Sequence, residues 1–263
     1  HMRDLQKIKA QLETQPDRQL SQTDPDARAM TTHSAKGTAM VGYNVQTAVD
    51  TKNHLIVAHE VTNTGSDRSQ LSKLALAASE AMGRAGLQAI ADRGYYSGLE
   101  LKACEDAGIA AYVPKPMTSS ANADGRFDKG DFIYIAREDE YLCPAGNRAI
   151  HRFTSEEKGM QIRIYWSSAC IGCAIKAQCT PSSSRRIRRW EHEAVMESVQ
   201  HRLDRMPQAM TVRKSTVEHV FGTLKQWMGW THFLTRGMGN VSTEMSLNVL
   251  AYNLKRVISI LGI

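Results

Sequence analysis

Four of the five cysteines in this 263-residue chain have the type and spacing of metal ligands. They follow a C-x26-C-x2-C-x5-C pattern, whose tight pair is typical of a tetrahedral site, and the pattern favours structural zinc. Zinc would stabilise residues 117–185, a segment with few apolar residues for a core of its own. Disulfides and unbridged thiols are the alternatives. The four candidate ligands are Cys143, Cys170, Cys173 and Cys179, while Cys104 is expected to be core filling.

Asp92 is a second candidate site residue, because it follows a short apolar run at residues 87–91 that predicts a buried strand. Ser97 and Glu100 then have the spacing of a capping box and predict a helix, and residues 109–113 predict another strand. A strand, helix, strand unit implies parallel pairing with a right-handed crossover. Asp92 therefore lies at the carboxyl end of a parallel strand, where catalytic groups gather in α/β sheets.

A third candidate is the helix predicted over residues 208–228, on which Glu218 and Lys225 share one face two turns apart. Lys214 lies one turn before Glu218, and His219 beside it is a candidate for supporting the Glu218 side chain. A carboxylate between two cations is unusual for a surface without a function. The alternative is an ion pair between Lys214 and Glu218, with Lys225 solvated.

The elements that must position these residues predict an α/β fold interrupted by an insertion. Residues 1–40 predict an amphipathic helix followed by a loop, and residues 41–49 and 55–62 a strand hairpin. Asp67 is expected to cap the helix after this hairpin. The expected parts are 1–40, a first part of the core at 41–116, the Cys-rich insertion at 117–185, and a helical C-terminal part at 186–263. The last helix presents an apolar stripe of Leu247, Leu250, Leu254, Val257 and Leu261.

Four stretches of the chain resemble the insertion-sequence transposases of the DDE, ribonuclease-H-like superfamily. They are GYNVQTAVD at 42–50, ADRGYYS at 91–97, RKSTVEHVFGTLKQWMG at 213–229 and AYNLKR at 251–256. The resemblance implies a mixed sheet with flanking helices and a small β-rich zinc-binding insertion. It also implies that Asp92 is the second metal-binding carboxylate, that Glu218 is the third, and that Lys225 touches DNA.

The first carboxylate of that pattern is less directly placed. The ribonuclease-H-like fold has three antiparallel strands before its first helix, whereas the sequence predicts only two here, so the first strand and its Asp are expected upstream of this chain. Asp50 is the alternative within the chain, followed by Asp24 and Asp26. The opening His1-Met2 is typical of a vector scar, which agrees with an excised piece of a longer protein.

The implied activity is Mg²⁺-dependent cleavage and strand transfer in DNA by two metal ions, which activate the nucleophile and stabilise the leaving oxygen. The partners implied are the transposon ends and target DNA, and a second subunit in a homodimer of the full-length protein. The alternatives are a metal-dependent nuclease without joining activity and a non-catalytic remnant of such an element, stabilised by zinc, that only binds DNA. The cations expected to contact phosphates are Arg185, Arg186, Arg188, Arg189, Arg213, Lys214 and Lys225.

The charge distribution agrees with a polyanionic partner. Residues 1–180 carry 21 Lys and Arg against 21 Asp and Glu, while residues 181–263 carry 12 against 6, so the whole net charge of +6 lies in the last third. A localised excess is typical of a nucleic-acid-binding face, although a solvated surface would look the same. No apolar run reaches the roughly 18 residues of a membrane span, and residues 1–11 lack a secretion signal, which indicates a cytoplasmic protein without membrane partners.

Overall fold

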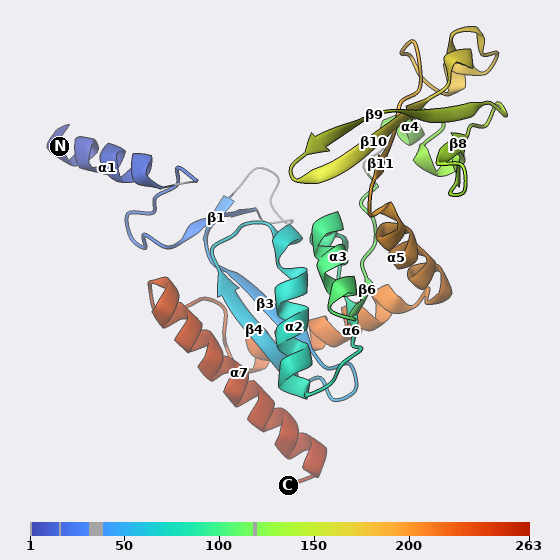
Figure 1. Cartoon of the computed structure of the whole chain (residues 1–263). Helices are drawn as coiled ribbons and strands as arrows, with labels where there is room; N and C mark the ends of the chain where they lie inside the picture. Colours follow the sequence, from blue (N-terminus) through green and yellow to red (C-terminus); the bar gives the residue numbers. More distant parts are fainter. Residues whose placement is uncertain (1, 16, 32–38, 118–119) are drawn as a thin grey trace. The chain divides into compact units, whose positions relative to one another are not determined.

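The computed structural model divides the chain into two compact units, each described here by itself (Figure 1). The residues that it describes are 2–15, 17–31, 39–117 and 120–263. Unit 1 combines His1–Pro114 with Val199–Ile263, and unit 2 is Lys115–Ser198. The predicted α/β composition is confirmed, because helices and strands alternate along the chain.

Unit 1 contains the predicted hairpin and the predicted parallel strand pair. Its strands are β1 (Arg28–Thr31), β2 (Ala39–Gly42), β3 (Asn44–Val49), β4 (Ile56–Thr62), β5 (Gln88–Ile90) and β6 (Ala110–Tyr112). Its helices are α1 (Met2–Thr14), α2 (Leu71–Met82), α3 (Gly98–Asp106), α6 (Ala209–Gly222) and α7 (Met238–Leu261), with α5 (Glu193–Arg205) crossing from unit 2. Strands β3 and β4 pair antiparallel, and β5 and β6 pair parallel with α3 between them in the chain, as the sequence predicted.

The N-terminal segment differs from the predicted loop, because β1 and β2 pair antiparallel with Arg28 opposite Gly42. The pair forms a two-stranded sheet of its own, apart from the β3–β4 hairpin. A four-residue strand has too little periodicity to be read from sequence. Residues 32–38 of the predicted loop lie outside the described residues.

The core of unit 1 lies between the β3–β4 hairpin and the C-terminal helices. Val220 of α6 and Leu224 of the π-helical turn after it (Thr223–Trp227) pack with Val241 and Met245 of α7 against Ile56 of β4. Figure 1 shows α2 and α7 running alongside this hairpin. The stripe predicted on α7, by contrast, is exposed: Leu247, Leu250, Leu254 and Leu261 each keep more than half of their surface.

Two predicted helix caps are replaced by longer-range contacts. Ser97 makes no capping bond, and the Glu100 carboxylate instead accepts hydrogen bonds from the Ser72 backbone N–H at 2.8 Å and its hydroxyl at 2.7 Å, so α3 caps α2. Asp67 begins a short 3₁₀ turn (Asp67–Ser69) that separates it from α2, whose first flanking residue is Gln70. The Asp67 carboxylate is therefore free to face β3.

Unit 2 is a five-stranded antiparallel sheet in the order β11-β10-β9-β8-β7. The strands are β7 (Ile133–Ile135), β8 (Glu140–Leu142), β9 (Arg148–Glu157), β10 (Met160–Trp166) and β11 (Ile187–Trp190), preceded by the short helix α4 (Ser120–Ala123). One face buries Tyr141, Tyr165 and Ile187, and the other buries Ile162, Ile164 and Trp190. The segment predicted as a Cys-rich insertion lies largely in this unit.

Candidate active site

Asp92 lies directly after β5, at the carboxyl end of the parallel pair. Its side chain begins a 3₁₀ turn (Arg93–Tyr95) by accepting a hydrogen bond from the Gly94 backbone N–H at 2.9 Å. A Cβ atom added to Gly94 would lie 2.9 Å from the same Asp92 oxygen, so glycine permits this close approach without a shift of the Asp92 side chain. The sequence Asp-Arg-Gly thus fixes the carboxylate at the end of the sheet.

Arg213 of α6 occupies the other oxygen of this carboxylate. The Arg213 Nη2 atom lies 2.7 Å from Asp92 Oδ2, and the Asp92 side chain remains 41% exposed. The sequence predicted that Arg213 contacts DNA, whereas here it pairs with a predicted metal ligand. The ion pair brings α6 to the carboxyl end of β5, across 121 residues of sequence.

A polar network beside Asp92 escaped sequence analysis. Asp67 Oδ1 accepts hydrogen bonds from the side-chain amides of Asn44 and Gln46, each at 2.7 Å. The Tyr95 hydroxyl donates to the Gln46 Oε1 atom, and Gln46 is 2% exposed. The only sequence signal was that Asn44 and Gln46 are two residues apart on β3, so their side chains share one face of the strand.

The two carboxylates of Asp67 and Asp92 lie near each other across Gly94. A Cβ placed on Gly94 would be 2.9 Å from an Asp92 oxygen and 3.5 Å from an Asp67 oxygen. Burial, followed by the charges of these two carboxylates, raises the pKa of Tyr95 far above its usual value. Tyr95 therefore stays a neutral hydrogen-bond donor beside a pair of negative charges.

These groups line a cavity of about 630 Å³ within unit 1. Strand β3 and strand β5 form its walls, together with α2 and the side of α6 that carries Arg213, Thr216 and Val217. The polar groups Asp67, Asp92 and Tyr95 face this space, and the remaining lining includes apolar side chains of α2. The cavity has the mixed polar and apolar lining of a substrate site.

Glu218 lies on a different side of α6 from Arg213. It follows Arg213 by five residues, which is about 140° around a helix with about 100° per residue. Its side chain is 64% exposed, with an oxygen 4.0 Å from Lys214 Nζ, so the ion pair that the sequence allowed is present. Lys225 follows in a π-helical turn (Thr223–Trp227), and its Nζ lies 5.9 Å from the Phe221 ring centroid.

Asp50 lies in the turn between β3 and β4. Its carboxylate accepts the backbone N–H groups of Lys52 at 3.3 Å and Asn53 at 2.7 Å, so it closes the hairpin. It follows Gln46 by four residues, or about 13 Å at about 3.3 Å per strand residue. Within the described part of the chain, no three or more His, Cys, Asp or Glu side chains form a group able to hold a metal ion.

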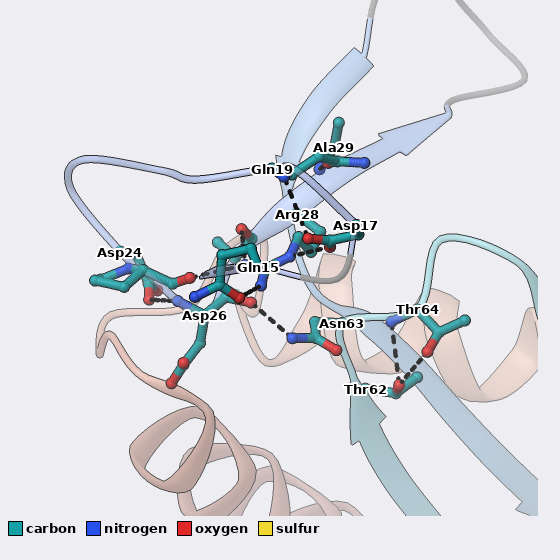
Figure 2. Close-up of polar contacts among 12 residues, drawn as sticks. Gln15, Asp17, Gln19, Asp24, Asp26, Arg28, Ala29, Thr62, Asn63 and Thr64 are labelled. Carbon is teal, nitrogen blue, oxygen red and sulfur yellow. Dashed lines mark hydrogen bonds and ion pairs between the residues drawn. The ribbon is translucent and has the colours of Figure 1, made fainter. Parts of the chain in front are cut away.

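Asp24 and Asp26, the remaining candidates for the first carboxylate, hold the N-terminal segment to α7. Asp24 is 9% exposed and accepts hydrogen bonds from the Tyr43 hydroxyl and the Gly237 backbone N–H. An Asp26 carboxylate oxygen accepts the Met238 N–H at 2.9 Å. Figure 2 shows the surrounding polar contacts, including the bond from the Asn63 side chain to the Asp26 carbonyl oxygen.

The four clustered cysteines line one small cavity of about 30 Å³ in unit 2, together with Phe127 and Phe132. Burial raises the pKa of Cys179; the nearby Arg185 lowers it, and the other three cysteines raise it further. Cys104 belongs to unit 1 and is fully buried there, in agreement with core filling. The four cysteines of unit 2 thus share one cavity, but the described residues do not bring three or more of them together as a group able to hold a metal ion.

Comparison with known proteins identifies a family for the second half of the chain. Residues 142–258 match the family model described as the transposase DDE domain. The match confirms the resemblance to insertion-sequence DDE transposases. No curated protein and no solved structure matches the chain.

A transposase DDE domain implies DNA as the substrate and a place among the polynucleotidyl transferases and nucleases, which generally use divalent metal ions such as Mg²⁺. The matched segment includes Glu218, Lys225 and the four clustered cysteines, while Asp92 precedes it. None of the described helices has the length and apolar character needed to cross a membrane.

The arginines that the transposase resemblance assigned to DNA have different surroundings in unit 2. Arg189 is buried, 2.6 Å from Glu197 and stacked on Tyr134, so it stabilises the unit itself. Arg188 pairs with Glu157, and the Arg185 guanidinium lies 5.6 Å from the Phe132 ring centroid. Arg186 is exposed and lies over the Trp166 ring.

Proposed function

We propose that this chain carries the catalytic site of a DNA transposase, which cleaves phosphodiester bonds and joins DNA strands in an Mg²⁺-dependent reaction. The observation that carries the proposal is Asp92 at the carboxyl end of β5, in a polar cavity next to the helix that bears Glu218. The match of residues 142–258 to the transposase DDE domain supports this choice of reaction.

Asp92 and Glu218 are the proposed metal ligands. Two Mg²⁺ ions, when bound, would activate the attacking oxygen and stabilise the leaving oxygen of the phosphodiester. Carboxylate oxygens are the ligands that Mg²⁺ prefers, and Asp92 keeps an exposed carboxylate in the cavity. Within the chain, Asp50 is the proposed candidate for the first carboxylate.

Residues of the chain prepare this site before metal and DNA bind. Arg213 neutralises Asp92, and Gly94 orients its carboxylate through a backbone hydrogen bond. The network of Asn44, Gln46 and Tyr95 holds Asp67 beside it. Lys214 on α6 and Lys225 on the π-helical turn that follows it are proposed to contact DNA phosphates near Glu218.

We also propose that zinc binds Cys143, Cys170, Cys173 and Cys179 and stabilises unit 2. Their common cavity supports this role, and deprotonated thiolates are suited to a tetrahedral zinc site. A cytoplasmic location agrees with cysteines that are unbridged in the described structure.

The proposed activity is tested with the full-length protein and a supercoiled plasmid that carries the terminal inverted repeats of its element. We expect nicking that needs Mg²⁺ and is abolished by Asp92→Asn and by Glu218→Gln. Asp106→Asn, which removes an exposed carboxylate paired with Lys102, is the matched control and should nick as the wild type does. Nicking by either site variant at the wild-type rate would refute the site.

The products of the same reaction separate the other two functions. A nuclease would nick without producing joined strands. A non-catalytic, zinc-stabilised remnant would bind the plasmid with an affinity that falls as salt is added, and it would show no metal-dependent cleavage.

A further inference from the structure

Trp166, the last residue of β10 in unit 2, lies within cation–π distance of two arginines. The Arg152 guanidinium carbon is 5.3 Å from its ring centroid and that of Arg186 is 5.6 Å away. The Phe153 ring meets Trp166 edge-on at 6.1 Å and is 45% exposed. Two cations and two aromatic rings are thus gathered at one end of the sheet.

A β-bulge brings Arg152 to this place. Ile164 pairs with Phe153 and Tyr165 with His151, so Arg152 is the extra residue of β9. A bulge re-aims the side chain of its extra residue. Arg152 Nε donates to the Trp166 carbonyl oxygen at 3.3 Å, and Nη2 donates to Ser168 Oγ at 3.0 Å.

The positive charge at this site is not compensated by a carboxylate. Other exposed arginines of the same sheet are paired: Arg148 with Glu138 and Glu140, Arg163 with Asp139, and Arg188 with Glu157. Among the described residues, neither Arg152 nor Arg186 forms an ion pair, and both are exposed. An anionic partner would therefore meet two guanidinium groups whose charge no carboxylate of the described residues neutralises.

We propose that Trp166, Phe153, Arg152 and Arg186 form a binding site for a DNA strand with unpaired bases. The two guanidinium groups bind phosphates, for which their planar fork is suited, and an exposed base lies against the aromatic rings. The partner follows from the proposed function, since DNA is the substrate. A base inside a duplex is stacked on its neighbours, so an aromatic surface favours unpaired nucleotides.

The experiment measures binding of a fluorescently labelled 15-nucleotide single strand, and of its duplex, by anisotropy without added Mg²⁺. We expect Arg152→Gln/Arg186→Gln to weaken single-strand binding at least tenfold. It should reduce the slope of log affinity against log salt by about 1.4, since each phosphate contact to a single strand contributes about 0.7. Arg163→Gln, which removes an exposed charge on the same strand as Trp166, is the matched control and should change binding less than twofold.

The aromatic part is tested with Trp166→Ala, expected to weaken single-strand binding about tenfold within the range seen for base stacking, and to leave duplex binding unchanged. Trp166→Phe should restore most of the lost single-strand affinity. All variants must keep the wild-type melting temperature. Unchanged single-strand binding in the double arginine variant, or equal losses for both DNA forms in Trp166→Ala, would overturn the proposal. Because no cleavage is measured, Asp92→Asn should bind normally, and failure of the catalytic proposal would leave this result intact.

Discussion

The Arg213 guanidinium lies 2.7 Å from the carboxylate that is the strongest metal-ligand candidate, that of Asp92. A guanidinium and a metal ion compete for the same carboxylate oxygen. Binding of Mg²⁺ must therefore displace Arg213 or share the carboxylate with it. The pair is partly exposed, with 28% of the Arg213 side chain accessible, and solvent screening makes displacement inexpensive.

Arg213→Gln should therefore lower the Mg²⁺ concentration that half-saturates nicking, by several-fold, because a competing cation is removed. The free energy of unfolding should fall by about 1 kcal/mol or less, as expected of a partly exposed ion pair. The measurement is a Mg²⁺ titration of plasmid nicking. Arg205→Gln, which removes an exposed charge at the end of α5 that does not line the cavity, should leave the midpoint unchanged. A higher midpoint in Arg213→Gln would contradict the competition.

Gln46 is expected to be the least replaceable polar residue beside this site. Gln46→Leu would leave the Tyr95 hydroxyl without its acceptor and would remove one donor from Asp67, at a cost of about 1–3 kcal/mol for a buried group left unsatisfied. Denaturant unfolding measures the loss. Gln88→Leu, at an exposed position on β5, is the control and should change stability by less than about 0.5 kcal/mol.

Sequence periodicity predicted the elements around Asp92 but not their mutual contacts. The strand, helix, strand unit was readable because both strands are short and apolar, and because a polar turn precedes the helix and Gly108 follows it. The contact of Asp67 with Gln46 was not, because it joins residues that are 21 positions apart and depends on a 3₁₀ turn.

The helix α7 shows a different limit of sequence reasoning. It has two apolar stripes, one with Met245 and Val249 and one with Leu250 and Leu254, and periodicity alone cannot say which one packs. The structure buries the first stripe and exposes the second.

Glu218 was found by its resemblance to a motif, and its exposure beside Lys214 was predictable from spacing.

The four-cysteine cluster predicts about one equivalent of zinc in protein purified without added metal. Cys170→Ser/Cys173→Ser should lose this zinc and lower the melting temperature, because the small cavity would lose its stabilising ion. Cys104→Ala is the control for a buried cysteine outside the cluster and should keep the zinc. Elemental analysis decides, and a melting temperature that is insensitive to chelation would exclude the site.

Cys104 should be unreactive at neutral pH. Burial raises the pKa of its thiol to about 11, with a smaller contribution from Glu100. The folded state therefore keeps the thiol neutral, and since the unfolded thiol ionises near its reference value, stability should fall as the pH rises from about 9 toward 11. Mass spectrometry after iodoacetamide at pH 8 should find Cys104 unmodified in the native protein and modified in urea; labelling in the native state would contradict its burial.

The exposed leucines of α7 predict self-association through this helix, in line with the proposed homodimer. Leu247, Leu250, Leu254 and Leu261 recur at spacings of three, four and seven, the pattern of a helix pair. Their exposure in the chain leaves a continuous apolar stripe, which would be costly to keep in water.

Leu250→Glu/Leu254→Glu should convert a dimer to a monomer in sedimentation at micromolar concentrations. In the dimer, the introduced glutamates of the two α7 helices would lie close together and repel each other. The core residues Met245 and Val249, on another side of α7, are unchanged in this variant. Ser259→Glu adds a charge to the same helix about 120° from Leu247 and should preserve the dimer. If the double variant sediments as the wild type does, α7 is not the interface, and the stripe must be covered by another surface.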